Sequence, residues 1–214
     1  SFGGASGEEY YDFLFEPFQA AYEAQSISDA ADFGYWTASP YTLQGCDQPS
    51  ISYSVPLVLD NGTVYGVLGV DLLVSYLQTL LPHGELFDNN QGSYLMAVAS
   101  EDSEGRLICS PTLLNSATLK PSDFDGPLVL SGTPDGDWTF QAGGNTYYAA
   151  VKYLPLYNTN TSFEAQHWAL IGAVRTDHLY SFSRQVQMLL VLVTLCTLAA
   201  GVAGSLIIGR RFSK

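Results

Sequence analysis

Basic residues are scarce in this chain of 214 residues, which has 8 Lys and Arg against 21 Asp and Glu and a formal net charge of −13. Three of the basic residues, Arg210, Arg211 and Lys214, lie in the last five positions. Binding to a nucleic acid needs clustered Lys and Arg, so the composition argues against a nucleic acid partner. Hydrophobic residues make up 47% of the chain, which is enough for the core of one large domain or two small ones.

Catalytic and metal-binding motifs are also missing. The chain has 3 Cys and 3 His, and no pair of them has metal-ligand spacing. There is no phosphate-binding Gly-Lys-Ser/Thr loop and no Gly-x-Ser-x-Gly nucleophile motif. The sequence therefore predicts no catalytic residue, no metal and no cofactor. Cys46 and Cys109 leave two alternatives open, a disulfide in an oxidising compartment or two unpaired small residues.

One stretch lacks charge altogether, from Gln185 to Gly209. Within it, residues 188–209 would form a helix roughly 33 Å long, which is enough to cross the apolar part of a bilayer. The alternative is a buried helix of a soluble protein, but such helices seldom stay apolar on all sides for so long. All acidic residues precede the stretch and "RRFSK" follows it. The positive-inside rule then predicts a plasma membrane protein with residues 1 to about 184 outside the cell. We expect a juxtamembrane helix at 177–187 and a transmembrane helix at 188–209, and the cytoplasmic region should start at 210–214.

The first residues, "SFGGASGEEYY", lack the basic and apolar regions of a signal peptide. Because an external domain needs an export signal, we expect a further segment before Ser1, most simply a first transmembrane helix.

A β-hairpin is predicted for Ile51–Asp71, because Asn61-Gly62 suits a two-residue type I′ turn. Pairing Asp60 with Thr63 places Ser52 opposite Asp71. Alternation of side chains then divides the hairpin into two faces. One face is small and polar, with Ser52, Ser54, Gly69 and Asp71. The other is expected to be core, with Ile51, Tyr53, Val55, Leu68 and Val70.

Helices and a second group of strands are predicted around the hairpin. Apolar spacing in Glu8–Glu23 indicates helix, but Pro17 should divide it into two short helices. A short helix should start at Leu72. We expect a first module at 1–82, a linker at 83–92 and a second module at 93–176, which includes two strands around Gly143-Gly144. From Asp177 one unbroken helix should continue into the membrane.

Two stretches resemble a known family. The pattern "GYW…SPY…ISYSVPLVLDNGTVYGVLGVDLLVSYLQTLL" is similar to the ligand-facing part of a Cache domain, and "YYAAVKYLPLYNTNTSFEAQHWALIGAV" resembles the membrane-proximal module of the double form. The resemblance implies an α+β fold of two PAS-like modules, each an antiparallel sheet with flanking helices, followed by the transmembrane helix. It also implies that part of the first module precedes Ser1.

The function implied by this resemblance is that of an extracellular small-molecule sensor. Such domains belong to bacterial membrane-bound signal transducers, namely histidine kinases, cyclic-dinucleotide enzymes and chemoreceptors. They pass ligand binding through the transmembrane helix to a cytoplasmic effector, which can itself be an enzyme. The alternative is a membrane-anchored surface protein for binding or adhesion with no signalling output.

Asp71 allows two interpretations, a cap for the following helix or a ligand-binding carboxylate. In amino-acid-binding Cache domains an Asp at this position binds the ammonium group of the ligand, and an Arg binds the carboxylate. Glu16 stands where that Arg would be, so a cationic amine is favoured over an amino acid, while a neutral sugar or nucleobase stays open. The candidate ligand-binding residues are Asp71, Trp36, Tyr41, Tyr35, Tyr53, Ser52, Ser54 and Phe18. For Trp36, Tyr35 and Tyr41 the alternative is packing within a loop.

Small residues recur every four positions in the apolar stretch, at Thr197, Gly201, Ser205 and Gly209. This spacing allows two helices to approach closely in lipid and predicts a homodimer. Small residues are also common in membrane helices without such a role.

Overall fold

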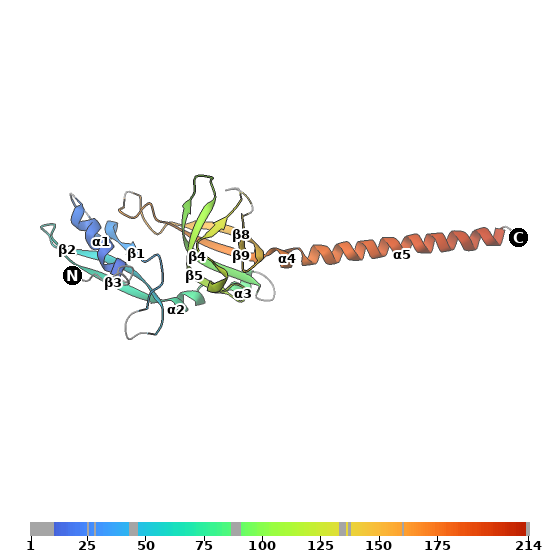
Figure 1. Ribbon diagram of the computed structural model, residues 1–214, viewed down its shortest axis with the longest axis horizontal. Helices are drawn as coiled ribbons and strands as arrows, with labels where there is room; N and C mark the ends of the chain where they lie inside the picture. Colours follow the sequence, from blue (N-terminus) through green and yellow to red (C-terminus); the bar gives the residue numbers. More distant parts are fainter. Residues whose placement is uncertain are drawn as a thin grey trace. The chain divides into compact units, whose positions relative to one another are not determined.

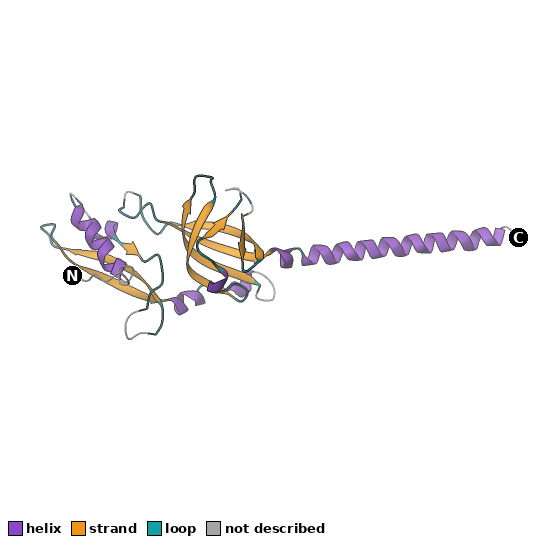
Figure 2. Cartoon of the chain, in the orientation of Figure 1, coloured by secondary structure: helices purple, strands orange, loops and turns teal. Residues whose placement is uncertain are grey.

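The computed structural model describes residues 11–24, 26–27, 29–42, 47–86, 91–132, 136, 138–159 and 161–212. The chain forms two compact units, Ser1–Arg175 and Thr176–Lys214. The first unit contains two antiparallel sheets with a few short helices, and the second is helical (Figures 1 and 2). The α+β class with antiparallel sheets that the sequence predicts is thereby confirmed.

The first sheet has the strand order β1-β2-β3, with β1 at Tyr35–Trp36, β2 at Ser50–Val58 and β3 at Val64–Leu73. The predicted pairing of β2 with β3 is confirmed from Ser52 opposite Asp71 to Pro56 opposite Val67. Alternating small and apolar residues on two adjacent strands fix this register, because a shift by one residue would exchange the two faces.

The predicted turn was wrong by one residue. The backbone of Leu59, rather than Asp60, bonds to that of Thr63, so the loop has three residues and Gly62 takes the left-handed position at φ 82°. A three-residue hairpin loop of this kind carries an extra residue next to it. Here Val58 pairs with Val64, the expected partner Tyr65 is the extra residue, and the predicted register resumes at Leu57 opposite Gly66.

A single helix, α1 at Asp12–Glu23, packs on β1, β2 and β3 (Figure 1). The prediction of two short helices was wrong, because Pro17 lies inside α1 without ending it. Pro17 has no N–H for the carbonyl of Phe13, four residues earlier. The hydroxyl of Ser54 on β2 donates to that carbonyl oxygen instead. The sheet thus supplies the hydrogen bond that the proline removes.

The helix covers the small polar face of the sheet, which reverses the expected burial. Ser52 and Ser54 are fully buried, whereas Leu68 and Val70 are each 59% exposed. The expectation that the whole apolar face is core was therefore wrong, although Ile51 on that face is buried. Small side chains let the backbone of α1 come close to the sheet, and the large side chains of β3 point the other way.

The second sheet has the strand order β6-β5-β4-β9-β8-β7. Its strands are β4 (Gly92–Glu101), β5 (Leu107–Ser116), β6 (Leu128–Leu130), β7 (Trp138–Ala142), β8 (Asn145–Leu154) and β9 (His167–Arg175). The predicted hairpin around Gly143-Gly144 is confirmed, because Ala142 pairs with Asn145 and both glycines have positive φ. Alternate residues of these strands form the main core, including Leu95, Ala97, Ile171 and Tyr147.

Cys109 lies in this core as a free thiol, fully buried. Burial raises the pKa of its thiol to about 11, because the thiolate form is disfavoured away from water. Cys46 lies outside the described residues. Of the two alternatives for these cysteines, the described part of the chain shows Cys109 unpaired.

Short helices occupy the connections, with η2 at Ala30–Phe33, α2 at Val74–Thr79, α3 at His83–Leu86 and η4 at Pro121–Asp123. The expected linker at 83–92 therefore begins with a helical turn. The side-chain amide of Asn115 on β5 donates to the carbonyl oxygens of Gln78 and Leu81, at 2.8 Å each. These bonds attach α2 and the residues after it to the second sheet.

The second unit contains α4 at Thr176–Leu179 and α5 at Ser181–Phe212. The prediction of one unbroken helix from Asp177 was wrong, since Tyr180 separates the two. The interruption is local, because Tyr180 N–H still bonds to the Thr176 carbonyl at 3.1 Å and Arg184 N–H to the Tyr180 carbonyl at 3.0 Å. Tyr and Ser are weaker helix formers than Leu or Ala, which fits a break at Tyr180-Ser181.

In the part of the chain that the structure describes, no helix has both the length and the apolar character that crossing a membrane requires.

Candidate functional site

Asp71 lies in β3 and does not cap a helix. The next helix, α2, starts at Val74 rather than at the predicted Leu72. Its N-cap residue is Leu73, and no side chain makes a capping hydrogen bond there. The capping interpretation is therefore wrong, because Asp71 lies before the N-cap and within the paired strand.

The carboxylate of Asp71 instead takes part in a cluster with two hydroxyl groups. Tyr41 O–H donates to Asp71 Oδ1 at 2.9 Å, and the Ser52 hydroxyl donates to the same oxygen. The two hydroxyl oxygens also lie within hydrogen-bond distance of each other. We call Tyr41, Ser52 and Asp71 the Asp71 cluster.

Backbone pairing sets the geometry of the Asp71 cluster. Ser52 and Asp71 are directly opposite on β2 and β3, so their side chains point to the same side of the sheet. Tyr41 is brought alongside by backbone bonds in both directions with Ser50. The Asp71 side chain is exposed, and among the described residues no hydrogen bond reaches its second oxygen, Oδ2. The cluster therefore fixes one carboxylate oxygen and leaves the other open.

Phe13 of α1 adds an aromatic surface next to the cluster. Its ring stacks on that of Tyr41, with centroids 5.1 Å apart and planes 7° from parallel. The sequence analysis missed Phe13. The sequence does contain a signal for Phe13, because it lies four residues before Pro17 and eight before Ala21, the two buried residues of α1. That spacing marks the face of the helix that meets the sheet.

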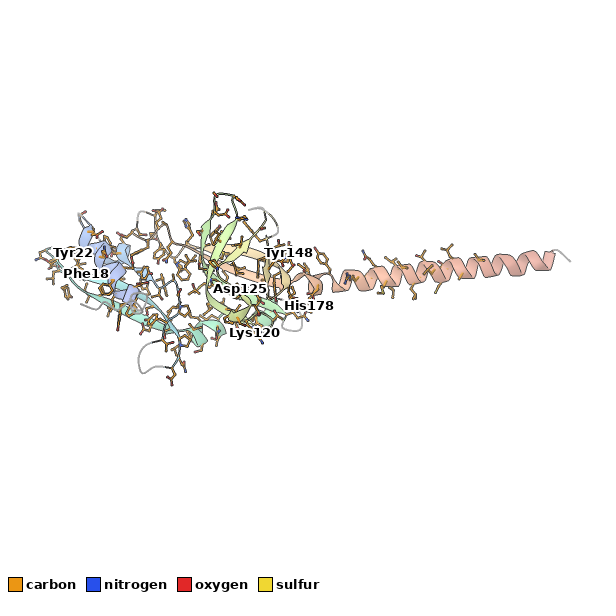
Figure 3. All side chains as sticks on the ribbon, viewed as in Figure 1. Phe18, Tyr22, Lys120, Asp125, Tyr148 and His178 are labelled. Atoms are coloured by element: carbon orange, nitrogen blue, oxygen red, sulfur yellow. The ribbon has the colours of Figure 1, made fainter. Side chains whose placement is uncertain are left out.

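Phe18 was predicted to reach the ligand, but it contacts its own helix. Its ring stacks with Tyr22, with centroids 6.1 Å apart and planes 8° from parallel; both rings are labelled on α1 in Figure 3. Tyr22 is 73% exposed, so this pair lies at the surface. Phe13, one helical turn earlier, is the residue that α1 places at the cluster.

Trp36 and Tyr53 lie on the opposite face of the sheet from Asp71. Trp36 pairs with Tyr53 and Tyr53 pairs with Val70, so their side chains share one face, and Asp71 follows Val70 on the other. The rings of Trp36 and Tyr53 are 4.9 Å apart. The structure therefore does not bring the candidate residues Trp36 and Tyr53 to the face of the sheet that carries Asp71.

Tyr35 and Ser54 are on the α1 side but are engaged in packing. Tyr35 is buried, and its ring lies 4.9 Å from that of Phe163. Burial raises the pKa of Tyr35, and the carboxylates of Asp12 and Glu16 on α1 raise it further. The Ser54 hydroxyl already donates to the Phe13 carbonyl. The structure thus brings together only Tyr41, Ser52 and Asp71 from the predicted set.

The charge around the cluster is negative. Asp12 and Glu16 lie close enough to Tyr35 to affect its pKa, and Asp71 lies on the same face of the sheet. Among the described residues, no group of His, Cys, Asp and Glu is arranged to hold a metal ion. An open carboxylate oxygen beside stacked aromatic rings can pair with an organic cation through charge and through cation–π contact.

No protein-family model and no curated protein matches the chain. Among solved structures, the ligand-binding domain of PctB, an amino acid chemoreceptor of Pseudomonas aeruginosa PAO1 solved with L-Arg, is 15% identical. It matches 68% of this chain and 55% of its own, with a TM-score of 0.42. The PctC domain from the same organism, solved with GABA, is 12% identical over 81% of this chain and 65% of its own, with a TM-score of 0.45.

The periplasmic domain of RsbU from Chlamydia trachomatis is 15% identical over 75% of this chain and 61% of its own, with a TM-score of 0.40. The chain thus spans 55% to 65% of the length of these three structures. Two are ligand-binding domains of chemoreceptors and one is a periplasmic domain.

Proposed function

We propose that this chain is the extracellular sensor region of a bacterial membrane-bound signal transducer and that it binds a small organic cation at the Asp71 cluster. The observation that carries the proposal is the state of the Asp71 carboxylate. Tyr41 and Ser52 orient it through Oδ1, the ring of Tyr41 stacks on that of Phe13, and among the described residues no hydrogen bond reaches Oδ2. An oriented carboxylate with an oxygen at the surface can pair with an ammonium group through a charge-assisted hydrogen bond.

The charges on the same side favour a cation over an anion or an ordinary amino acid. Asp12 and Glu16 add negative charge near Tyr35, and Glu16 occupies the position at which a carboxylate-binding Arg would be expected from the family pattern. A ligand carboxylate would find no guanidinium for paired hydrogen bonds at that position. An ammonium group without a neighbouring carboxylate suits the site better.

The remaining parts of the proposal rest on the sequence. The uncharged residues 188–209, followed by Arg210 and Arg211, support a transmembrane helix with residues 1 to about 184 outside the cell. We further propose two PAS-like modules at 1–82 and 93–176, a homodimer in the membrane, and no catalytic site or cofactor in this chain.

A membrane-anchored binding protein without signalling output is the alternative function, because the same cation site would serve ligand capture. The gene sequence after Lys214 separates the two functions. A kinase, cyclase or methyl-accepting region encoded there would favour sensing, and a stop codon would favour the anchored protein.

The cation site is tested by thermal denaturation of the full chain in the presence of choline, a small quaternary ammonium. A ligand that binds only the folded state raises the melting temperature. We expect choline to raise it for the parent and for Asp60→Asn, which removes one exposed carboxylate from the same hairpin. For Asp71→Asn the rise should disappear. Equal rises for both variants would show that Asp71 does not recognise the cation.

A further inference from the structure

An apolar pocket of about 380 Å³ lies in the first compact unit, where α2 packs against β5. Its walls come from the chain before β2, from α2, from β5, and from η4 with the residue that follows it. None of the residues of the Asp71 cluster lines it. The pocket and the Asp71 cluster are therefore formed by different residues.

Hydrogen bonds between the walls hold this pocket in shape. The Thr112 hydroxyl on β5 donates to the carbonyl oxygen of Ala38, in the chain before β2. Gln78 on α2 donates from its Nε2 to the Leu114 carbonyl oxygen at 2.8 Å, and the Asn115 amide donates back to the Gln78 carbonyl oxygen at 2.8 Å. Because these bonds form without a ligand, binding would lose little free energy to the ordering of the walls.

Proline rings form much of the wall. Pro40, Pro49, Pro111 and Pro121 line the pocket, together with Phe124. A proline has a fixed φ and no backbone N–H, so these rings present a rigid apolar surface. Ligand pockets of this size are mostly apolar, with a few polar groups that orient the ligand. A flat aromatic ligand would bury its faces against these rings.

Charge is absent from the lining of this pocket. None of the described residues that line it is acidic or basic, although the chain has a formal net charge of −13. A charged ligand would lose its hydration in the pocket without gaining an ion pair. The pocket therefore favours a neutral ligand, in contrast to the cation proposed for the Asp71 cluster.

Gln78 supplies a hydrogen-bond acceptor in the wall. Its Nε2 faces the Leu114 carbonyl oxygen, which only accepts, so the side-chain amide has one orientation. Among the described residues no hydrogen bond reaches its Oε1, and this oxygen is not among the buried polar atoms that lack a partner. It is therefore accessible. The Thr112 hydroxyl already donates its one proton to Ala38, so Oε1 is the acceptor that a ligand donor can use.

We propose that this pocket binds a small neutral aromatic molecule that carries an N–H or O–H donor. The proline rings and Phe124 contact the faces of the ligand, and its donor bonds to Gln78 Oε1. The site does not depend on the Asp71 cluster, so either site can fail its test without the other.

Indole and benzofuran test the pocket by calorimetry on the full chain. The two compounds are neutral and have nearly the same shape, but only indole has an N–H donor. We expect indole to bind and benzofuran to bind roughly fivefold more weakly, because it lacks one hydrogen bond. Absence of indole binding, or equal affinity for the two compounds, would overturn the proposal.

A variant of Gln78 tests the acceptor. Gln78→Met keeps the length of the side chain and removes Oε1, so it should abolish the preference for indole over benzofuran. Comparing the two compounds within one variant cancels changes in packing that the substitution causes. Ser75→Met, on the same helix but outside the pocket lining, is the matched control and should keep the preference. A preference that persists in Gln78→Met would show that Oε1 does not bind the ligand donor.

Methyl signals in NMR spectra locate the bound indole. Val74 lines the pocket, so the ring current of indole should shift its methyl signals, which are identified by their absence from Val74→Ala. Val70, which is 59% exposed on the first sheet and does not line the pocket, serves as the reference for unspecific binding. A shift of the Val70 signals without a shift of Val74, or an indole affinity that falls in Asp71→Asn, would place indole elsewhere and refute the site.

Discussion

At the scale of single residues, the contacts of Asp71 explain why an acid lies within an apolar strand. Its Oδ1 accepts hydrogen bonds from the hydroxyl groups of Tyr41 and Ser52. Ser52 is fully buried, so its hydroxyl cannot turn to bulk water as a replacement. The carboxylate therefore has a structural role at Oδ1 and a proposed binding role at Oδ2, and substitutions can separate the two.

Asp71→Ala should destabilise the fold by about 1–2 kcal/mol, because it removes the two charge-assisted hydrogen bonds that the carboxylate accepts from Ser52 and Tyr41. Asp71→Asn keeps an acceptor oxygen and should cost less than half of that amount. Urea denaturation measures both free energies of unfolding. The matched control is Asp60→Ala in the exposed turn, and a cost for Asp71→Ala no larger than for this control would refute the structural role of Oδ1.

At the scale of elements, the fit of α1 to the first sheet depends on one exchange of hydrogen bonds. Pro17 leaves the Phe13 carbonyl without its helical partner, and the Ser54 hydroxyl of β2 takes that place. Both Pro17 and Ser54 are fully buried. The exchange ties the helix to the face of the sheet that carries the Asp71 cluster, and it positions Phe13 next to Tyr41.

A double-mutant cycle tests this exchange. Ser54→Ala should cost about 1–3 kcal/mol in the parent, because it leaves the Phe13 carbonyl buried without a donor. In a Pro17→Ala background the backbone N–H of residue 17 can supply the helical bond, so Ser54→Ala should cost clearly less there. The free energies come from urea denaturation of the four proteins. Equal costs of Ser54→Ala in both backgrounds would show that the two residues do not act together.

The elements that the sequence predicts well are those with local signals. Alternating residues and the Asn61-Gly62 and Gly143-Gly144 turns place the two hairpins. The register from Ser52 to Leu57 agrees with the prediction because the extra residue Tyr65 compensates for the longer turn. Which side of the sheet a helix covers is a tertiary property. The predicted burial was therefore wrong at Leu68 and Val70, which are exposed. The covered side could not be read from hydrophobicity because α1 packs on the small polar face.

The candidate site was predicted only in part for the same reason. Tyr41, Ser52 and Asp71 come together because strand pairing was correct on β2 and β3. The place of Trp36 depends on how β1 pairs with β2, for which the sequence contains no turn signal. Trp36 was consequently expected on the wrong face, and Phe13 was missed.

At the scale of the whole molecule, the proposed homodimer places the face of Thr197 and Gly201 at the helix interface. Among the described residues, no atom outside the backbone of α5 lies within 4 Å of a Cβ added at Gly201, so that face can receive a partner. In vesicles, Gly201→Cys and Ser205→Cys should form disulfide-linked dimers in higher yield than Ala199→Cys and Ala203→Cys, which lie on the opposite side of the helix. The native cysteines are first replaced by Ser. Equal yields at all four positions would show that this face of the helix is not a dimer interface.

The central claim is that Asp71 recognises a small organic cation, and calorimetry with a matched pair of compounds tests it most directly. Choline and 3,3-dimethyl-1-butanol have nearly the same shape and differ in charge. We expect choline to bind the full chain and its Asp60→Asn variant equally. Choline should bind Asp71→Asn at least about tenfold more weakly, and the neutral compound should not bind. Choline affinity that is unchanged in Asp71→Asn, or no choline binding by the parent, would contradict it.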